Sequence, residues 1–146
     1  MSSSRDLEPM IVEVVGAVIR DAAGRVLTVR KRGTSRFMLP GGKRQPGEDD
    51  LPALARELRE ELGVALLEAQ PLGRFEAAAA NEPGARVRSS AYLVVVRGTP
   101  RASAEIEDLR WIDPAAPGPT PLAPLLTGGI LPAVIAASRA TPPGSD

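Results

Sequence analysis

Apolar residues in the first third of the chain fall into short runs separated by turn residues. Residues 11–20 and 25–32 are rich in valine and isoleucine, and residues 21–24 between them form a tight-turn sequence ending in glycine. β-Branched runs on both sides of such a turn are typical of a hairpin, so we predict that these two segments pair with each other. A loop follows, with a short strand at residues 37–39 that the Pro-Gly-Gly sequence at 40–42 ends sharply.

The next segment changes to the periodicity of an amphipathic helix. Asp49, Asp50 and Pro52 are typical of a helix start, with acidic N-cap candidates and proline in the first turn. The helix should extend to about Leu62 and stop at Gly63, because glycine suits the left-handed position after a helix. On this helix Leu51, Leu54, Leu58 and Leu62 share one face, and Glu57, Glu60 and Glu61 share another.

The remaining pattern predicts three more strands and a helical C-terminal segment. Residues 72–80 and 85–98 look like two long strands joined by a turn, and residues 109–113 look like a short final strand. Residues 121–139 are rich in Ala, Leu and Ile and predict one or two helices, broken near residues 128–129. The order of elements indicates one domain of the α/β or α+β class.

The length of 146 residues favours a single domain, large enough to bury a core without disulfides or a structural metal. We expect that domain at residues 11–140, with a flexible N-terminal tail at 1–10 and a disordered tail at 141–146. The chain has no apolar stretch long enough to span a bilayer, and its first residues lack the apolar core of a secretory signal. We therefore expect a cytoplasmic protein with no membrane partner.

Composition restricts the chemistry that the chain can perform. The chain has no Cys and no His, which excludes nucleophile–histidine pairs and zinc sites built on thiolate or imidazole. Carboxylates remain, and they suit hard cations such as Mg2+, Mn2+ and Ca2+. Lys plus Arg and Asp plus Glu each number 18, so the chain has no global basic field to hold a nucleic-acid polymer.

Residues 42–64 contain the most specific motif of the chain, spaced as G-x5-E-x7-R-E-U-x-E-E-x-G-U, where U is a bulky aliphatic residue. This motif resembles the signature of the Nudix hydrolases, of the MutT-like kind. The resemblance implies an α/β/α sandwich with a mixed β-sheet between helices. It also implies an enzyme that cleaves a diphosphate bond in a nucleoside diphosphate derivative with Mg2+ or Mn2+. The fixed positions are filled by Gly42, Glu48, Arg56, Glu57, Leu58, Glu60, Glu61, Gly63 and Val64.

Three glutamates lie within one arc of the predicted helix. Like charges at this spacing repel each other, and a divalent cation would remove that cost. An acidic stripe alone is commonly a solvated helix face, but the surrounding motif residues favour a metal site. By the resemblance, Glu60 and Glu61 match the central metal ligands, and Glu57 matches a ligand of a second metal or the general base.

Two more positions acquire roles from the same resemblance. The backbone carbonyl of Gly41 matches another metal ligand, and the paired glycines allow the chain to turn tightly there. Arg56 matches a residue that braces the loop through Glu48 and orients the ligand carboxylates. We therefore expect Arg56 to support catalysis by Glu57 and Glu61 without touching the substrate.

Outside the motif, the strongest candidate is an acidic residue near the C-terminal third. Glu105 lies six residues before Trp111, in a stretch that resembles the one where some MutT-type members place a further metal ligand or base. Glu107 is the rival for that role, and a solvated loop carboxylate is the simpler alternative. Trp111 is expected to pack in the core or on the sheet.

Candidate substrate contacts lie shortly before the Pro-Gly-Gly turn. Arg30, Lys31 and Arg32 end a strand near that turn, so one of them can reach a phosphate, and we select Arg30 and Arg32. Phe37 could stack on a nucleobase or pack in the core. Arg86 and Arg88 share one face of a strand and are weaker candidates.

The substrate is chosen by elimination. The proline and tyrosine that the resemblance would require in ADP-ribose pyrophosphatases and diadenosine-polyphosphate hydrolases are missing at their positions downstream of the motif. We therefore favour MutT-like hydrolysis of a nucleoside triphosphate to a monophosphate and pyrophosphate. The alternatives are hydrolysis of ADP-ribose, a dinucleotide or a nucleotide sugar, or a non-catalytic nucleotide-sensing module. The expected partner is a small nucleotide, and a homodimer is left open.

Overall fold

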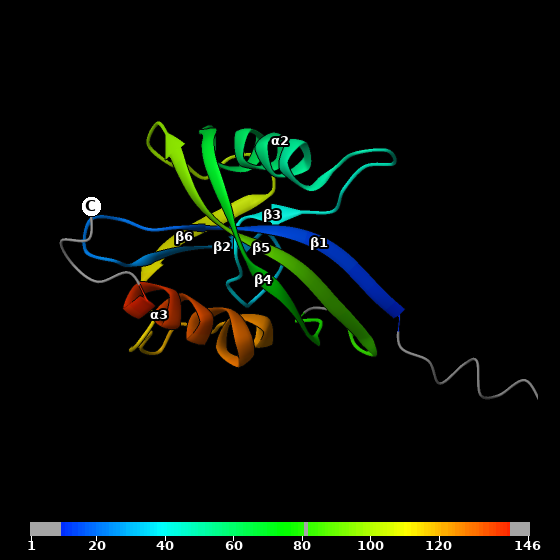
Figure 1. Ribbon diagram of the computed structural model, residues 1–146. Coiled ribbons are helices and arrows are strands. Elements are labelled where there is room, and N and C mark those ends of the chain that lie inside the picture. Colours follow the sequence, from blue (N-terminus) through cyan, green and yellow to red (C-terminus); the bar gives the residue numbers. More distant parts are fainter. Residues whose placement is uncertain (1–9, 81, 141–146) are drawn as a thin grey trace, which may run out of the picture.

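The computed structural model describes residues 10–80 and 82–140, which form two β-sheets between helical layers (Figure 1). The larger sheet has the strand order β3-β1-β5-β4, and the smaller sheet pairs β2 with β6. β1 runs parallel to β5, whereas β3 and β4 pair antiparallel with their neighbours, so the larger sheet is mixed. The elements are β1 (Met10–Ile19), β2 (Val26–Lys31), β3 (Gly41–Gly42), α2 (Asp50–Leu62), β4 (Ala65–Ala78), β5 (Ala85–Arg97), β6 (Ile106–Ile112), the π-helical turn η1 (Leu126–Ile130) and α3 (Leu131–Ala140).

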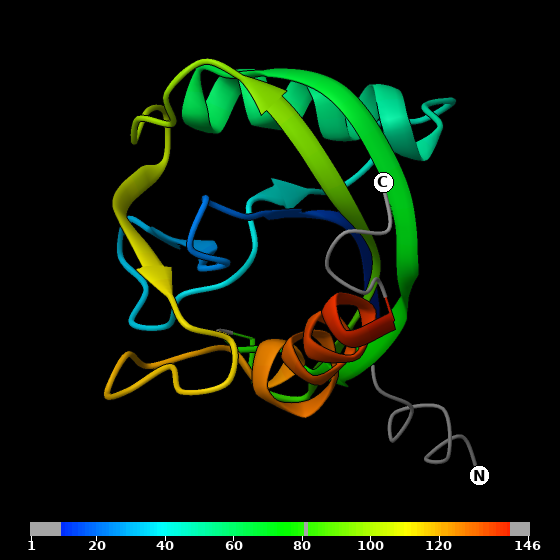
Figure 2. The same ribbon diagram turned by 60° about the vertical axis from the view of Figure 1, so that its left-hand side comes forward.

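The two helical layers bury separate hydrophobic clusters. α2 packs Leu54 and Leu58 into a cluster with Val15 of β1, and η1 and α3 pack into a second cluster that contains Val18 and Phe37. Neighbouring β1 residues thus face opposite layers, as the alternation of a strand requires. β4 curves from the α2 layer to the α3 layer (Figure 2). The predicted α/β/α sandwich with a mixed sheet is confirmed.

The predicted hairpin between the first two strands is wrong. The turn itself forms, since the amide of Asp21 donates to the carbonyl of Arg25 at 3.0 Å, and Arg20 and Val26 form an isolated bridge beyond it. After this bridge the strands separate, because β1 pairs with β5 along its whole length and β2 pairs with β6. The residues from Val15 to Ile19 are all buried, which is the pattern of a central strand.

The helix predicted after the Pro-Gly-Gly turn is confirmed with its boundaries. α2 ends at Leu62, and Gly63 follows with φ of 68° in the left-handed region, where glycine has no steric cost. Asp49 occupies the N-cap position in an extended conformation. Leu51 departs from the predicted core-facing stripe, because it lies in the first turn and is 42% exposed.

The two long strands are confirmed, and the first is longer than predicted. β4 begins at Ala65, before the predicted start at residue 72, because register shifts near Leu66 and Pro71 let an irregular strand keep pairing with β5. Part of the connecting turn, Asn81, lies outside the described residues. The final strand also starts earlier than predicted, at Ile106.

The C-terminal segment is helical without the predicted break. Residues 124–125 are α-helical, the chain widens into the π-helical turn η1, and α3 follows directly. A Cβ atom on Gly129 would lie 2.9 Å from the Phe75 ring of β4. Glycine at this position therefore lets the helical layer approach the sheet closely, rather than ending the helix.

The expected tails fall outside the described residues, except that Met10 already belongs to β1. Within residues 10–80 and 82–140, the helices are too short or too polar to cross a membrane.

Candidate active site

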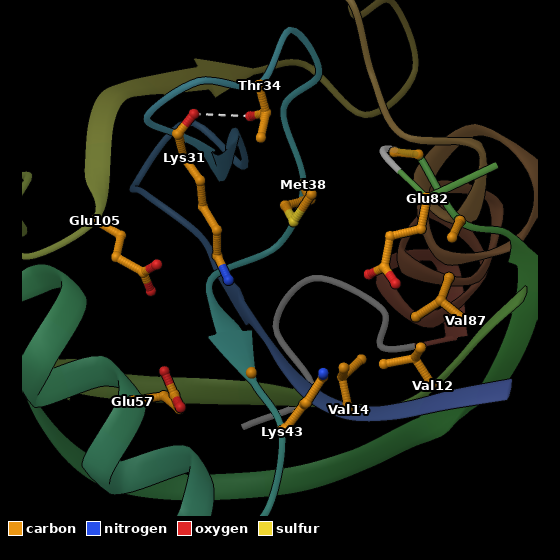
Figure 3. A pocket seen from close by; sticks show the side chains of 13 residues that line it. Val12, Val14, Lys31, Thr34, Met38, Lys43, Glu57, Glu82, Val87 and Glu105 are labelled. Atoms are coloured by element: carbon orange, nitrogen blue, oxygen red, sulfur yellow. Dashed lines mark hydrogen bonds between the residues drawn. The ribbon is translucent and has the colours of Figure 1, made fainter. Parts of the chain in front are cut away.

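A pocket of about 440 Å³ opens where β3, the middle of α2 and the start of β1 meet. Figure 3 shows Glu57 and Glu105 on one side of this pocket and Val12 and Val87 on the other, with the side chain of Lys31 extending between them. Glu82 lies on the same side as Val87, so the apolar side chains share their side of the pocket with a carboxylate. Its lining residues are Val12, Val14, Lys31, Thr34, Met38, Gly42, Lys43, Glu57, Ala79, Ala80, Glu82, Val87 and Glu105.

A second, more apolar pocket of about 120 Å³ adjoins the first and shares Val14, Lys31, Met38 and Val87 with it. It extends towards Leu126 at the start of η1. The two pockets together make a continuous depression, charged near α2 and lined by aliphatic side chains and methionine towards the C-terminal layer. This arrangement suits a ligand with an anionic part and a flat apolar part.

The paired glycines of β3 have different structural tasks. Gly41 has φ of 143°, and a Cβ atom there would lie 2.0 Å from the carbonyl oxygen of Val15, so a side chain cannot fit. A Cβ atom on Gly42 would lie 2.7 Å from the carboxyl carbon of Glu57. Gly41 therefore lets β3 pair closely with β1, and Gly42 leaves the space in which the Glu57 carboxylate lies.

Glu61 is the buried carboxylate of the site, with 4% of its surface exposed. Its Oε1 accepts a hydrogen bond from the amide of Gly41 at 3.1 Å. Burial raises the pKa of Glu61 to about 7, and the neighbouring Glu57 adds to this, while the Gly41 amide and the charge of Lys31 act in the opposite direction. Two adjoining carboxylates, one of them desolvated, need a positive charge between them when both are ionised.

The third glutamate of the acidic face is oriented differently. The Glu60 side chain is 54% exposed and lies 3.7 Å from a guanidinium nitrogen of Arg56. Among residues 10–80 and 82–140, no group of three His, Cys, Asp or Glu side chains is positioned to hold a metal ion. The structure thus brings Glu57 and Glu61 together and leaves Glu60 towards solvent, so the ligand set of Gly41, Glu57, Glu60 and Glu61 stays a prediction. At Gly41, the amide rather than the carbonyl contacts a ligand candidate.

Arg56 connects the loop before α2 to the pocket. It donates to both carboxylate oxygens of Glu48, at 2.8 Å each, and to Oε2 of Glu57 at 3.0 Å. It also donates to the carbonyl of Lys43 at 3.2 Å. The hydrogen bonds from Arg56 hold the pKa of Glu48 down at about 2. The expected contact between Arg56 and Glu48 is present, and the same guanidinium also orients Glu57.

We expect Arg56→Ala to lower both activity and thermal stability. The substitution leaves the half-buried Glu48 carboxylate without its partner and releases Glu57, so kcat should fall by about tenfold or more and the melting temperature should drop by several degrees. Turnover and thermal melts of the variant measure both effects. Arg86→Ala is the matched control, because it removes a surface ion pair with Glu76 at 2.8 Å on another part of the sheet. An Arg56→Ala variant with parental kcat and melting temperature contradicts the bracing role.

The structure separates the two acidic candidates outside the motif. Glu105 lines the pocket opposite Lys31 (Figure 3). Glu107 forms an ion pair with Arg30 at 2.9 Å instead. Of these two residues, Glu105 is therefore the one placed where it can act on a bound ligand.

The substrate contacts selected from sequence lie away from the pocket. Arg30 also donates to the carbonyl of Thr34 at 3.0 Å, Arg32 is exposed, and neither residue lines the pocket. Phe37 is 2% exposed, with the Arg110 guanidinium 4.7 Å from its ring centre, so it packs in the core. Lys31, between the two arginines, faces the pocket, because successive strand residues point to opposite sides.

Sequence reasoning overlooked other pocket residues. Lys43 follows directly after the second glycine of β3, and Met38 and Glu82 come from separate loops. A lysine beside a tight glycine turn and an acidic helix was a usable signal for Lys43. Met38 and Glu82 carried no signal of their own, since their position depends on how distant segments meet. Arg86 and Arg88, the weaker candidates, both pair with Glu76 across the strands.

The chain belongs to the Nudix family, since a family model described as NUDIX domain matches residues 10–130. The solution structure of the E. coli ORF135 protein has a TM-score of 0.73 and 30% identity, covering 92% of this chain and 96% of that one. The 8-oxo-dGTP diphosphatase of Haemophilus influenzae is 36% identical over 74 residues, which are 48% of this chain and 54% of that protein. The RNA pyrophosphohydrolase of Halorhodospira halophila is 39% identical over 59 residues, 40% of this chain and 33% of that protein. The chain thus matches about half or less of the length of these two relatives.

Proposed function

We propose that the chain is a metal-dependent pyrophosphohydrolase that converts a nucleoside triphosphate to a monophosphate and pyrophosphate by water attack on phosphorus. The observation that carries the proposal is the pair of adjoining carboxylates, Glu57 and Glu61, of which Glu57 lines a pocket that a smaller, more apolar pocket adjoins. All fixed positions of the family motif are present around this pair. The similarity to an 8-oxo-dGTP diphosphatase supports a triphosphate substrate.

Mg2+ or Mn2+ fits the donors present. Glu57 and Glu61 supply hard oxygen ligands, and the burial of Glu61 beside a second carboxylate makes a cation favourable at this point. Glu60 directly precedes Glu61 on α2, and we assign it as a further ligand from its place in the motif. When bound, the cation would neutralise the diphosphate and lower the pKa of the attacking water.

The side chains around the carboxylate pair divide the pocket into two substrate regions. Lys31 and Lys43, which line the same pocket as Glu57, supply positive charge for the phosphate chain. The nucleobase would lie against Val14, Met38 and the other apolar residues of the adjoining pocket. Aromatic residues are only 3% of the chain, so aliphatic and methionine contacts replace a base sandwich between two rings.

The chain has no histidine, so a carboxylate takes the place of an imidazole as the general base that accepts the proton of the water. Glu105 lines the pocket on the same side as Glu57 (Figure 3), and its carboxylate is therefore placed to accept that proton from a water bound there. Glu57 is the other candidate, although its Oε2 already accepts from Arg56 at 3.0 Å.

The alternative activities remain hydrolysis of ADP-ribose, a dinucleotide or a nucleotide sugar, and nucleotide sensing without turnover. The intact glutamates at positions 57, 60 and 61 favour hydrolysis over sensing, because a binding module has no need of the carboxylates. The charged residues of the larger pocket suit the diphosphate of any of these nucleotides, and the adjoining apolar pocket of about 120 Å³ favours a single base.

We expect activity to depend fully on a divalent cation. A screen of nucleoside triphosphates, ADP-ribose, dinucleotides and nucleotide sugars, with products identified by chromatography, should reveal turnover in Mg2+ or Mn2+ and negligible turnover in excess EDTA. Restoring the cation should restore the rate, because the Glu57 and Glu61 pair requires it. Full turnover in chelator would remove the proposed mechanism, and nucleotide binding without turnover would favour the sensing module.

A further inference from the structure

Tyr92 makes a contact that the motif does not account for. It is the only tyrosine of the chain, it lies on β5, and its ring packs against the cluster under α2. Its hydroxyl donates to Oδ2 of Asp50, the first residue of α2, at 2.6 Å. This bond with Asp50 raises the pKa of Tyr92 to about 12, so the hydroxyl stays a donor at neutral pH.

The same aspartate also holds the loop before the helix. Arg44 donates to Oδ1 of Asp50 at 2.7 Å and lies 3.7 Å from a carboxylate oxygen of Glu13 on β1. Asp50 thus uses one oxygen towards β5 and the other towards the loop. Arg44, Asp50 and Tyr92 are not fixed positions of the family motif, and they form a continuous contact from the sheet to the loop.

The loop between β3 and α2 carries Lys43, which lines the same pocket as Glu57 and lies next to Val14 (Figure 3). From the side of the pocket, Arg56 fixes the loop by binding Glu48 and the Lys43 carbonyl. Asp50 fixes the other flank of Lys43, because it binds Arg44, the residue directly after Lys43, at 2.7 Å. Without the second contact, the loop could rotate about the Arg56 contacts and carry the Lys43 side chain out of the pocket.

We propose that Tyr92, Asp50 and Arg44 form a second tie that positions Lys43 for the phosphate chain of the substrate. The tie acts through Lys43 and touches neither the substrate nor the Glu57 and Glu61 pair, so it determines phosphate affinity and leaves the chemical step unchanged. This inference rests on the proposed function for its role in turnover, while the tie itself can be tested by binding alone.

The test is a double-mutant cycle in which calorimetry measures the affinity of each variant for inorganic pyrophosphate in the presence of Mg2+. Tyr92→Phe keeps the ring packing and removes only the hydroxyl, and it should weaken pyrophosphate binding about fivefold. Lys43→Gln should weaken binding about tenfold. Because the tie acts through Lys43, the double variant should bind no more weakly than Lys43→Gln alone.

Hydrogen exchange gives a second readout without any ligand. Amides of residues 43–49 should exchange faster in Tyr92→Phe than in the parent, since the loop loses one anchor. Glu76→Gln is the control, because it breaks ion pairs with Arg86 and Arg88 on the same sheet without touching the loop. It should change neither exchange in this loop nor pyrophosphate affinity.

The outcomes are distinct. Additive losses in the double variant, unchanged affinity in Tyr92→Phe or unchanged loop exchange each overturn the tie. If the parent hydrolyses nucleotides, Tyr92→Phe should raise KM about fivefold with kcat within about twofold, and a loss confined to kcat also overturns it. If the parent hydrolyses no nucleotide, the proposed function fails, while the pyrophosphate cycle still decides whether Tyr92 positions Lys43.

Discussion

Glu61→Gln should reduce kcat by about 10²-fold or more while making the metal-free protein more stable at pH 8. Glutamine keeps the size of the side chain and can still accept the hydrogen bond from the Gly41 amide, which is 3.1 Å away in the parent. It removes the negative charge that would balance the cation, so turnover falls. It also removes a buried charge beside Glu57, so the free energy of unfolding of the metal-free protein increases.

The stability effect has a defined pH dependence. Burial raises the pKa of Glu61 from 4.5 to about 7, so between these values the folded protein binds more protons than the unfolded chain. Stability of the metal-free parent therefore falls as pH rises through this window, and the full cost, on the order of 3 kcal/mol, is present above pH 7. Glutamine does not titrate, so the stability of Glu61→Gln does not change in this window. The two proteins should therefore be equally stable near pH 4.5 and differ most at pH 8.

Denaturant unfolding in EDTA across this pH range measures the difference, and steady-state turnover in Mg2+ measures the loss of activity. Glu105→Gln in the same turnover assay provides the comparison outside the helix, where a large loss of kcat makes Glu105 a catalytic residue and a small loss makes it a loop carboxylate. Parental turnover in Glu61→Gln would contradict the site and favour the sensing module. A variant that loses stability and keeps metal-dependent turnover would instead define Glu61 as structural.

Gly42→Ala should lower kcat by about tenfold or more with little change in melting temperature. The added Cβ would lie 2.7 Å from the Glu57 carboxyl carbon, so the carboxylate must move. It is the end of a flexible side chain, and the backbone of Gly42 is not in the left-handed region, so the fold can accommodate the methyl group. The substitution therefore displaces the Glu57 carboxylate and lowers kcat, while the stability of the fold changes little.

Gly41→Ala is the matched control with the opposite expected result. Its Cβ would lie 2.0 Å from the carbonyl oxygen of Val15, and φ of 143° is unfavourable for alanine, so β3 cannot keep its pairing with β1. We expect a loss of a few kcal/mol in unfolding free energy. Thermal melts and turnover of both variants separate the two tasks. Equal stability losses in Gly41→Ala and Gly42→Ala would show that the second glycine is needed for the turn and not for Glu57.

The local part of the site could be predicted because helical spacing places Glu57 and Glu61 close together, and the family resemblance implied the contact between Arg56 and Glu48. One helix carries Glu57 and Glu61, and the short loop before it brings Glu48 within reach of Arg56. Glycine at position 63 ended the helix as expected. The metal-ligand role of these residues stays a prediction.

The parts that the sequence could not place depend on contacts between distant segments. Alternation shows that Lys31 faces away from Arg30, but which of them faces the pocket depends on the pairing of β2 with β6, which includes a register shift at this point. Phe37 lies in the core because its backbone pairs with that of Leu122, near the C-terminal helical layer. The hairpin failed for the same reason, since a strong turn does not reveal that β1 has a better partner in β5.

The parallel pairing of β1 with β5 has a consequence for how the chain acquires its structure. Met10 pairs with Ala85 and Ile19 pairs with Val94, so the partners lie about half the chain apart in sequence. The pairing of β2 with β6 joins segments at a similar separation. Closing such long loops slows folding, and during synthesis the valine-rich first strands must stay unpaired until most of the polypeptide has left the ribosome. The helix that carries the glutamates can form early, but its catalytic surroundings arise only in the last stage of assembly.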